Sequence, residues 1–183
     1  MKVSKSFAWS SAHLLPNHNG KCARLHGHNY LAEIMIDTAD IPDRREDRSS
    51  EGMVLDFYVL AELVGPGLID LWDHRFIAAG DEWPWDAGHL VVPDEFVRLG
   101  VRTTAENLAA ILAEEVRDRL FNRGFSCRYV TARVWETPKA FGESSTPGST
   151  LWLNTQAAMI GMMEFRTAKL DHLVAAPKGD ARE

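Results

Sequence analysis

The segment KCARLHGHNY, residues 21–30, places His26 and His28 two positions apart and Cys22 four positions before the first of them. In an extended strand, side chains at i and i+2 point to the same face of the sheet. Two imidazoles held in this way suit a tetrahedral metal ion, and a catalytic centre needs one more protein ligand. His13 on the preceding predicted strand can supply that ligand, because paired strands lie about 5 Å apart. The pattern alone leaves open that these are ordinary strand histidines without a metal.

Cys22 also allows two interpretations. A lone cysteine is most often a small buried apolar residue. Lys21 and Arg24 flank it, however, and a cationic environment lowers the pKa of a thiol, which favours a thiolate base beside a metal-bound substrate. Three further histidines have no such setting and are interpreted as surface or packing residues: His18, His89 and His172.

Two acidic positions could take part in the same chemistry. Asp73 directly precedes His74, and adjacent residues do not face each other on a regular element. The pair is therefore either a capping aspartate beside a packed histidine, or two groups that act together where the chain turns. Glu136 ends the apolar strand in VWET. It is either an exposed strand end or an anchor for a ring edge that presents two N–H donors.

Composition limits the class of protein. The chain has 183 residues, of which 45% are hydrophobic and 25% charged, as expected for one globular domain. A formal net charge of −6 argues against a nucleic-acid-binding surface. Two cysteines are too few for a disulfide scaffold, and no apolar run approaches the roughly 20 residues that span a bilayer. The N-terminus is too polar for a secretory signal, so we expect a cytoplasmic protein with free thiols.

Hydrophobic periodicity predicts the elements that must position these residues. It indicates strands over 3–15 and 29–37, then a long polar loop over 37–52. Leu60, Leu63 and Val64 have helical spacing, and Gly-Pro-Gly at 65–67 interrupts that helix.

The second half of the chain begins with an irregular segment, 76–102, and continues with the strongest helix, 103–121. Thr103 or Thr104 can cap this helix, and Glu106 lies in its first turn. Strands follow over 126–137 and 139–144. This order predicts an α+β fold with a four-stranded antiparallel sheet and two helices on one face. Its open edges favour oligomerisation.

The motifs FAWSSAHLLP, KCARLHGHNY, EGMVLDF, WDHRF, TTAENLA and VWET resemble, in this order, those of the 6-pyruvoyltetrahydropterin synthase / 6-carboxytetrahydropterin synthase family. They run from residue 7 to residue 137. The resemblance implies a tunnelling fold that assembles into barrels, usually a hexamer of two trimers with active sites at subunit interfaces. It implies one synthase-like domain, residues 1–148, and leaves residues 149–183 as a C-terminal extension without a counterpart.

The resemblance also implies a role for each candidate residue. Zn²⁺ would bind His13, His26 and His28, although imidazoles also take iron, nickel or copper. Cys22 would be the proton-abstracting base. Asp73 and His74 would complete the catalytic group from a neighbouring subunit. Glu136 would anchor the pterin, and Thr104 and Glu106 would line the pterin pocket.

The spacing Cys-x3-His-Gly-His resembles that of bacterial 6-carboxytetrahydropterin synthases, which act in the route to queuosine and other deazapurines. The implied reaction converts 7,8-dihydroneopterin triphosphate to 6-carboxy-5,6,7,8-tetrahydropterin, acetaldehyde and triphosphate. Alternatives are a 6-pyruvoyltetrahydropterin synthase, a related pterin side-chain lyase, and a non-catalytic pterin-binding paralogue. The cations Lys21, Arg24 and Arg75 are either triphosphate ligands or plain surface residues. Thr103 stands where the family usually has proline.

Overall fold

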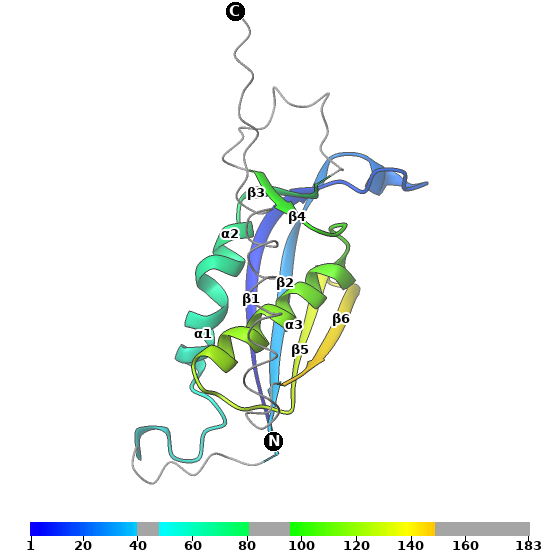
Figure 1. Ribbon diagram of the computed structural model, residues 1–183. Helices are drawn as coiled ribbons and strands as arrows, with labels where there is room; N and C mark the ends of the chain where they lie inside the picture. Colours follow the sequence, from blue (N-terminus) through cyan, green and yellow to red (C-terminus); the bar gives the residue numbers. More distant parts are fainter. Residues whose placement is uncertain (40–47, 81–95, 149–183) are drawn as a thin grey trace, which may run out of the picture.

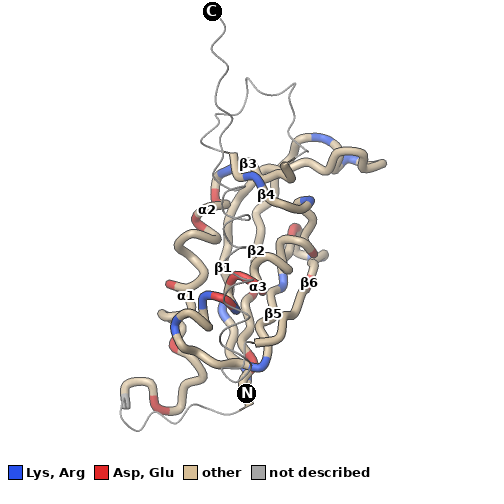
Figure 2. The backbone as a smooth tube through the Cα atoms, in the orientation of Figure 1, with Lys and Arg blue, Asp and Glu red and all other residues tan. Residues whose placement is uncertain are grey.

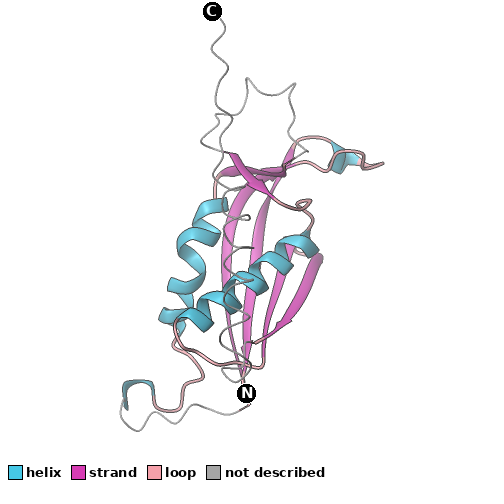
Figure 3. Cartoon of the chain, viewed as in Figure 1, coloured by secondary structure: helices cyan, strands magenta, loops and turns pink. Residues whose placement is uncertain are grey.

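The computed structural model describes residues 1–39, 48–80 and 96–148, which form one sheet with helices packed on one of its faces (Figures 1 and 3). The strand order is β4-β3-β1-β2-β5-β6. The strands are β1 (Lys2–His13), β2 (His26–Asp37), β3 (Arg75–Ala79), β4 (Phe96–Leu99), β5 (Tyr129–Thr137) and β6 (Ala140–Pro147). The helices are α1 (Phe57–Val64), α2 (Asp70–Trp72) and α3 (Ala105–Asn122).

The two longest strands, β1 and β2, pair antiparallel over their whole length, from Lys2 opposite Asp37 to His13 opposite His26. Their side chains alternate between a face covered by helices and an uncovered face, as a period of two requires. The covered face contributes Trp9, Tyr30 and Ile34 to the core. The sequence periodicity therefore predicts both strands correctly, although β2 begins three residues earlier than the apolar pattern.

Helix α3 begins and packs as predicted. Thr104 is its N-cap, and the side-chain oxygen of Thr104 accepts a hydrogen bond from the backbone N–H of Asn107 at 3.4 Å. Capping satisfies a donor that the first helical turn leaves unpaired. Its apolar stripe lies against the sheet and is fully buried at four positions: Leu108, Leu112, Val116 and Leu120.

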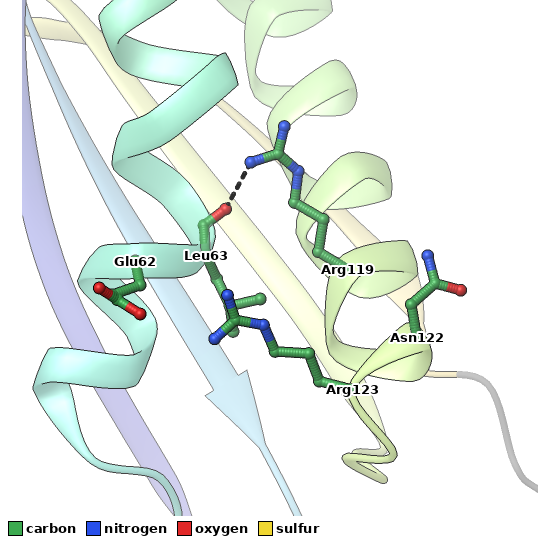
Figure 4. A pocket seen from close by; sticks show the side chains of 5 residues that line it. All are labelled: Glu62, Leu63, Arg119, Asn122 and Arg123. Atoms are coloured by element: carbon green, nitrogen blue, oxygen red, sulfur yellow. Dashed lines mark hydrogen bonds between the residues drawn. The ribbon is translucent and has the colours of Figure 1, made fainter.

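Helix α1 ends at Val64, where Gly-Pro-Gly interrupts it as predicted: Pro66 and Gly67 have non-helical backbone angles. The guanidinium of Arg119 on α3 closes this end, donating to the carbonyls of Leu63 at 2.7 Å, Pro66 at 2.7 Å and Gly67 at 2.9 Å. Figure 4 shows Arg119 reaching across from α3 to Leu63 beside a small pocket. A charged donor shared by three carbonyls ties the two helices together.

The prediction of four antiparallel strands is wrong, because the described sheet has six strands and is mixed. β3 pairs parallel with β1, and β4 pairs parallel with β3. Both strands fall within 75–102, most of which the sequence predicts as irregular. With five and four residues, they are too short to show a period. The parallel pairing of β3 with β1 requires a crossover, which residues 57–72 provide over the covered face.

Several predicted features lie outside the described residues. These are residues 40–47 of the polar loop 37–52, the linker segment 81–95, His89, His172 and the extension 149–183. In the ranges that are described, no helix is long and apolar enough to cross a bilayer. Figure 2 shows acidic and basic positions spread over both helices and strands.

Candidate metal centre

Three histidines meet on the covered face of the sheet, where β1 ends and β2 begins. The pairing register places His13 opposite His26 and Ser11 opposite His28. The ring centroid of His13 lies 4.5 Å from that of His26 and 5.1 Å from that of His28. The centroids of His26 and His28 are 4.9 Å apart. One potential ligand atom from each residue lies within 4.8 Å of the others. The three histidines named from the sequence are therefore brought together.

Backbone carbonyls hold two of these imidazoles through Nδ1. His13 Nδ1 donates to the carbonyl oxygen of Thr103 at 3.0 Å, and His26 Nδ1 donates to that of Arg24 at 2.7 Å. A carbonyl oxygen can only accept, so each Nδ1 must carry the proton. Each Nε2 therefore keeps a lone pair that points toward the centre of the cluster. Outer contacts of this kind are typical of metal-binding histidines.

His28 completes the same arrangement. Its Nε2 is buried and has no hydrogen-bond partner among the described residues. A hydrogen bond to the backbone of Glu136 acts on the same imidazole, and Nδ1 is the atom left to make it. The third unpaired nitrogen thus belongs to the same cluster as the Nε2 atoms of His13 and His26.

The cluster fits a divalent metal ion. His13 Nε2 and His26 Nε2 are 3.1 Å apart, although both carry lone pairs. Two ligands of a tetrahedral metal with bonds of about 2.0 Å are separated by about 3.3 Å. Burial and the neighbouring His26 lower the pKa of His13 to about 4, and burial lowers the pKa of His28. His13 and His28 are therefore neutral at pH 7, as metal ligands must be.

The predicted base, Cys22, lies in a 3₁₀ turn formed by Lys21–Ala23. Its thiol is free and half-buried, and its carbonyl accepts a hydrogen bond from Leu15 N–H at 2.8 Å. Cys22 lies close enough to Tyr30 to act electrostatically on its phenol. Tyr30 lies on the same face of the sheet as the three histidines, so Cys22 acts on a residue of that face.

The predicted anchor, Glu136, lies beside the cluster at the end of β5. Leu31 pairs with Trp135, so the next position of the register places Glu136 opposite Tyr30. Between Trp135 and Thr137 the pairing with β6 shifts, and such irregularities redirect side chains. Burial raises the pKa of Glu136, Glu106 raises it further, and His26 opposes both. Glu136 is therefore a half-buried carboxyl near the start of α3.

The start of α3 is held tightly against β6. A Cβ added to Gly142 would lie 2.4 Å from the backbone nitrogen of Glu106, so only glycine fits here. This approach brings Thr104 and Glu106 to the end of the sheet that carries Glu136. The Thr104 side chain caps α3, while Glu106 acts electrostatically on Glu136.

Asp73 and His74 contact each other and the edge of β1. Asp73 Oδ1 lies 3.0 Å from His74 Nδ1 and accepts a hydrogen bond from Ser10 N–H at 2.9 Å. His74 N–H donates to the Ser10 carbonyl at 2.6 Å. His74 has a φ of +57°, which is uncommon for a non-glycine residue. Its side chain is 82% exposed, so within one chain this pair faces solvent.

Sequence reasoning missed Tyr30 and the roles of the Thr103 and Arg24 carbonyls. Tyr30 follows His28 by two residues, so strand alternation places it on the same face. That signal was present in HGHNY. Which carbonyls hold the imidazoles depends on loop conformation, which residue types do not specify. Among the predicted triphosphate ligands, Lys21 and Arg24 are exposed and Arg75 is half-buried.

A mixed sheet with helices on one face and three convergent imidazoles at its end defines an α+β protein with a candidate metal centre. The family model described as 6-pyruvoyl tetrahydropterin synthase matches residues 2–146. The chain therefore belongs to the 6-pyruvoyl tetrahydropterin synthase family.

Curated relatives carry the name 6-carboxy-5,6,7,8-tetrahydropterin synthase. The Haemophilus influenzae protein is 32% identical over 145 residues, which is 78% of this chain and 96% of the relative. The Rickettsia conorii protein is 29% identical over 148 residues, or 78% of this chain and 99% of the relative.

Solved structures share the fold. Plasmodium falciparum 6-pyruvoyl tetrahydropterin synthase superimposes with a TM-score of 0.60 at 18% identity, covering 80% of this chain and 98% of its own. The Caenorhabditis elegans 6-pyruvoyl tetrahydropterin synthase gives a TM-score of 0.51 at 22% identity, covering 81% and 96%.

Proposed function

We propose that this protein is a zinc-dependent lyase that converts 7,8-dihydroneopterin triphosphate to 6-carboxy-5,6,7,8-tetrahydropterin, acetaldehyde and triphosphate, in the route to queuosine and other deazapurines. The observation that carries the proposal is the convergence of three imidazoles whose Nδ1 atoms face backbone groups. Family membership and the names of the relatives support the pterin substrate. Zinc bound to His13, His26 and His28 would act as a Lewis acid on the substrate's side-chain hydroxyls.

The other residues would bind the substrate and move its protons. Glu136 would accept hydrogen bonds from the N–H groups of the pterin ring, and its half-buried position beside the cluster supports this role. Thr104 and Glu106 would line the same pocket from the start of α3. Cys22 would remove a proton from the substrate side chain, supported by its free thiol and its electrostatic interaction with Tyr30.

The exposed pair Asp73 and His74 would complete the site of a neighbouring subunit. Their carboxylate–imidazole contact at 3.0 Å suits a proton shuttle, and the 82% exposure of His74 leaves it accessible to a partner copy. Leu31 and Phe141 on the uncovered face are 40% and 51% exposed, which favours an interface there. We propose a homo-oligomer, a hexamer of two trimers, with sites between subunits.

Product identification tests the reaction. Zinc-loaded protein is incubated with 7,8-dihydroneopterin triphosphate, and the products are separated and identified by mass spectrometry. 6-Carboxytetrahydropterin with acetaldehyde supports the proposal. A 6-pyruvoyl product would instead establish the triphosphate-eliminating alternative, and pterin binding without turnover would establish the paralogue.

Two variants test the assigned roles. Cys22→Ala should keep zinc and pterin binding while losing turnover, with Cys127→Ala as the control for the other free cysteine. Full activity of Cys22→Ala would refute the base. His28→Ala should lose zinc by elemental analysis, whereas His18→Ala should retain it. Unchanged zinc in His28→Ala would refute its role as a ligand.

A further inference from the structure

Tyr30 is a buried phenol whose ring is fixed within the candidate site. It is 1% exposed. Its ring stacks on Trp9 with centroids 4.8 Å apart and planes 9° apart. It meets the rings of His28 and His13 edge-on, at 5.4 Å and 6.0 Å. The ring therefore has a defined position next to two of the candidate metal ligands.

The hydroxyl of Tyr30 is buried and has no hydrogen-bond partner among residues 1–39, 48–80 and 96–148. In the part of the chain that the structure describes, the buried side-chain atoms without a partner are this oxygen and His28 Nε2. Leaving a buried hydroxyl unpaired is costly, and buried polar groups are almost always satisfied. Both unpaired atoms belong to one site, on residues two positions apart in β2. A ligand that binds at His28 Nε2 therefore meets a second unpaired polar group, the Tyr30 hydroxyl.

Other predicted site residues act on Tyr30. The register of β2 and β5 pairs Leu31 with Trp135, and its continuation by one position would set Tyr30 opposite Glu136. Glu136 and Cys22 both act electrostatically on the Tyr30 phenol. A phenol hydroxyl can donate a hydrogen bond. Tyr30 thus lies beside the candidate metal ligands His13 and His28 and interacts electrostatically with the candidate anchor and the candidate base.

We propose that the Tyr30 hydroxyl is a substrate-contact group that donates a hydrogen bond to the hydroxylated side chain of a bound pterin. This inference rests on the proposed function, because it needs a pterin whose ring is held at Glu136 and whose side chain reaches the three histidines. The side chain of such a ligand would pass Tyr30, which follows His28 by two positions along β2 and interacts electrostatically with Glu136.

The test compares Tyr30→Phe with the wild type in binding two pterins that are not turned over. Neopterin carries the hydroxylated side chain, and 6-methylpterin lacks it. Binding is followed by the fluorescence of the pterin, in zinc-loaded and in metal-free protein. Tyr58→Phe is the matched control, since its exposed hydroxyl donates to Glu62 at 2.9 Å, away from the histidines. Zinc content and melting temperature are measured for every variant.

Loss of one hydrogen bond predicts a dissociation constant for neopterin about 3- to 10-fold higher in Tyr30→Phe. The affinity for 6-methylpterin, the zinc content and both affinities of Tyr58→Phe should stay unchanged. Equal neopterin affinity in Tyr30→Phe overturns the proposal. An equal loss for both pterins, or a loss of zinc, also overturns it, because the hydroxyl would then serve the ring or the metal cluster.

A second measurement needs no variant of Tyr30. The chain has three tyrosines, so protein labelled with ¹³C at tyrosine Cζ gives three signals, and Tyr58→Phe and Tyr129→Phe assign two of them. Neopterin should shift the remaining signal, that of Tyr30, and 6-methylpterin should shift it less. If neopterin and 6-methylpterin shift the Tyr30 signal equally, the proposed contact between the Tyr30 hydroxyl and the hydroxylated side chain is contradicted. If the wild type binds neither pterin, both the proposed function and the Tyr30 contact are refuted. The wild-type titration shows this outcome before any variant is compared.

Discussion

Replacing His13 with asparagine should remove much of the acid sensitivity of the metal-free protein. In the folded chain, burial and His26 lower the pKa of His13 to about 4 from 6.5. Between these two values the unfolded chain binds a proton at this position and the folded chain does not. The contribution of His13 to the free energy of unfolding is therefore fully present above pH 6.5 and is lost as the pH drops toward 4. At about 1.4 kcal/mol for each pH unit, the loss amounts to about 3 kcal/mol.

Asparagine is the suitable replacement because its amide nitrogen can take the place of Nδ1, which donates to the Thr103 carbonyl at 3.0 Å. The assay is urea unfolding of chelator-treated protein between pH 7 and pH 4, followed by tryptophan fluorescence. The drop in the free energy of unfolding over this range should be about 3 kcal/mol smaller in His13→Asn than in the wild type. His18→Asn, at an exposed histidine, controls for losing a surface imidazole. A wild-type pH slope in His13→Asn would refute the reasoning.

Three further outcomes are expected. Gly142→Ala should lower the free energy of unfolding by about 2 kcal/mol, because its Cβ would meet Glu106 N at 2.4 Å. Gly100→Ala, with nothing within 4 Å, should leave the melting temperature nearly unchanged, and equal effects of both substitutions would contradict this. Arg119→Met should cost about 2–3 kcal/mol in urea unfolding by removing donors to three carbonyls. Arg117→Met, which loses a hydrogen bond to Thr146 and a contact with the neighbouring Asp118, should cost less, because these contacts do not tie two helices together; the reverse order would contradict the assignment. Chelation should lower the melting temperature and added zinc restore it, whereas identical melting with and without zinc would argue against a metal site.

Local patterns were enough to predict the longest elements. Alternating apolar residues specify β1, β2 and β5, because one face of each strand must be buried. The stripe from Leu108 to Leu120 and the cap at Thr104 specify α3 for the same kind of local reason. The short strands β3 and β4 could not be predicted, since four or five residues show no reliable period and the pairings of β3 with β1 and of β4 with β3 are non-local.

For the site, the sequence by itself determined which side chains share a face. The i, i+2 spacing of His26 and His28 puts them together in any strand, and pairing of adjacent strands brings His13 to them. Only the tertiary structure decided that backbone groups hold the imidazole Nδ1 atoms and leave the Nε2 atoms convergent. Only it brought Glu136 into electrostatic interaction with Tyr30 and left His74 exposed at the edge of β1. The physical reason is that alternation is a property of one strand, whereas tautomers, burial and register arise from contacts between residues far apart in the chain.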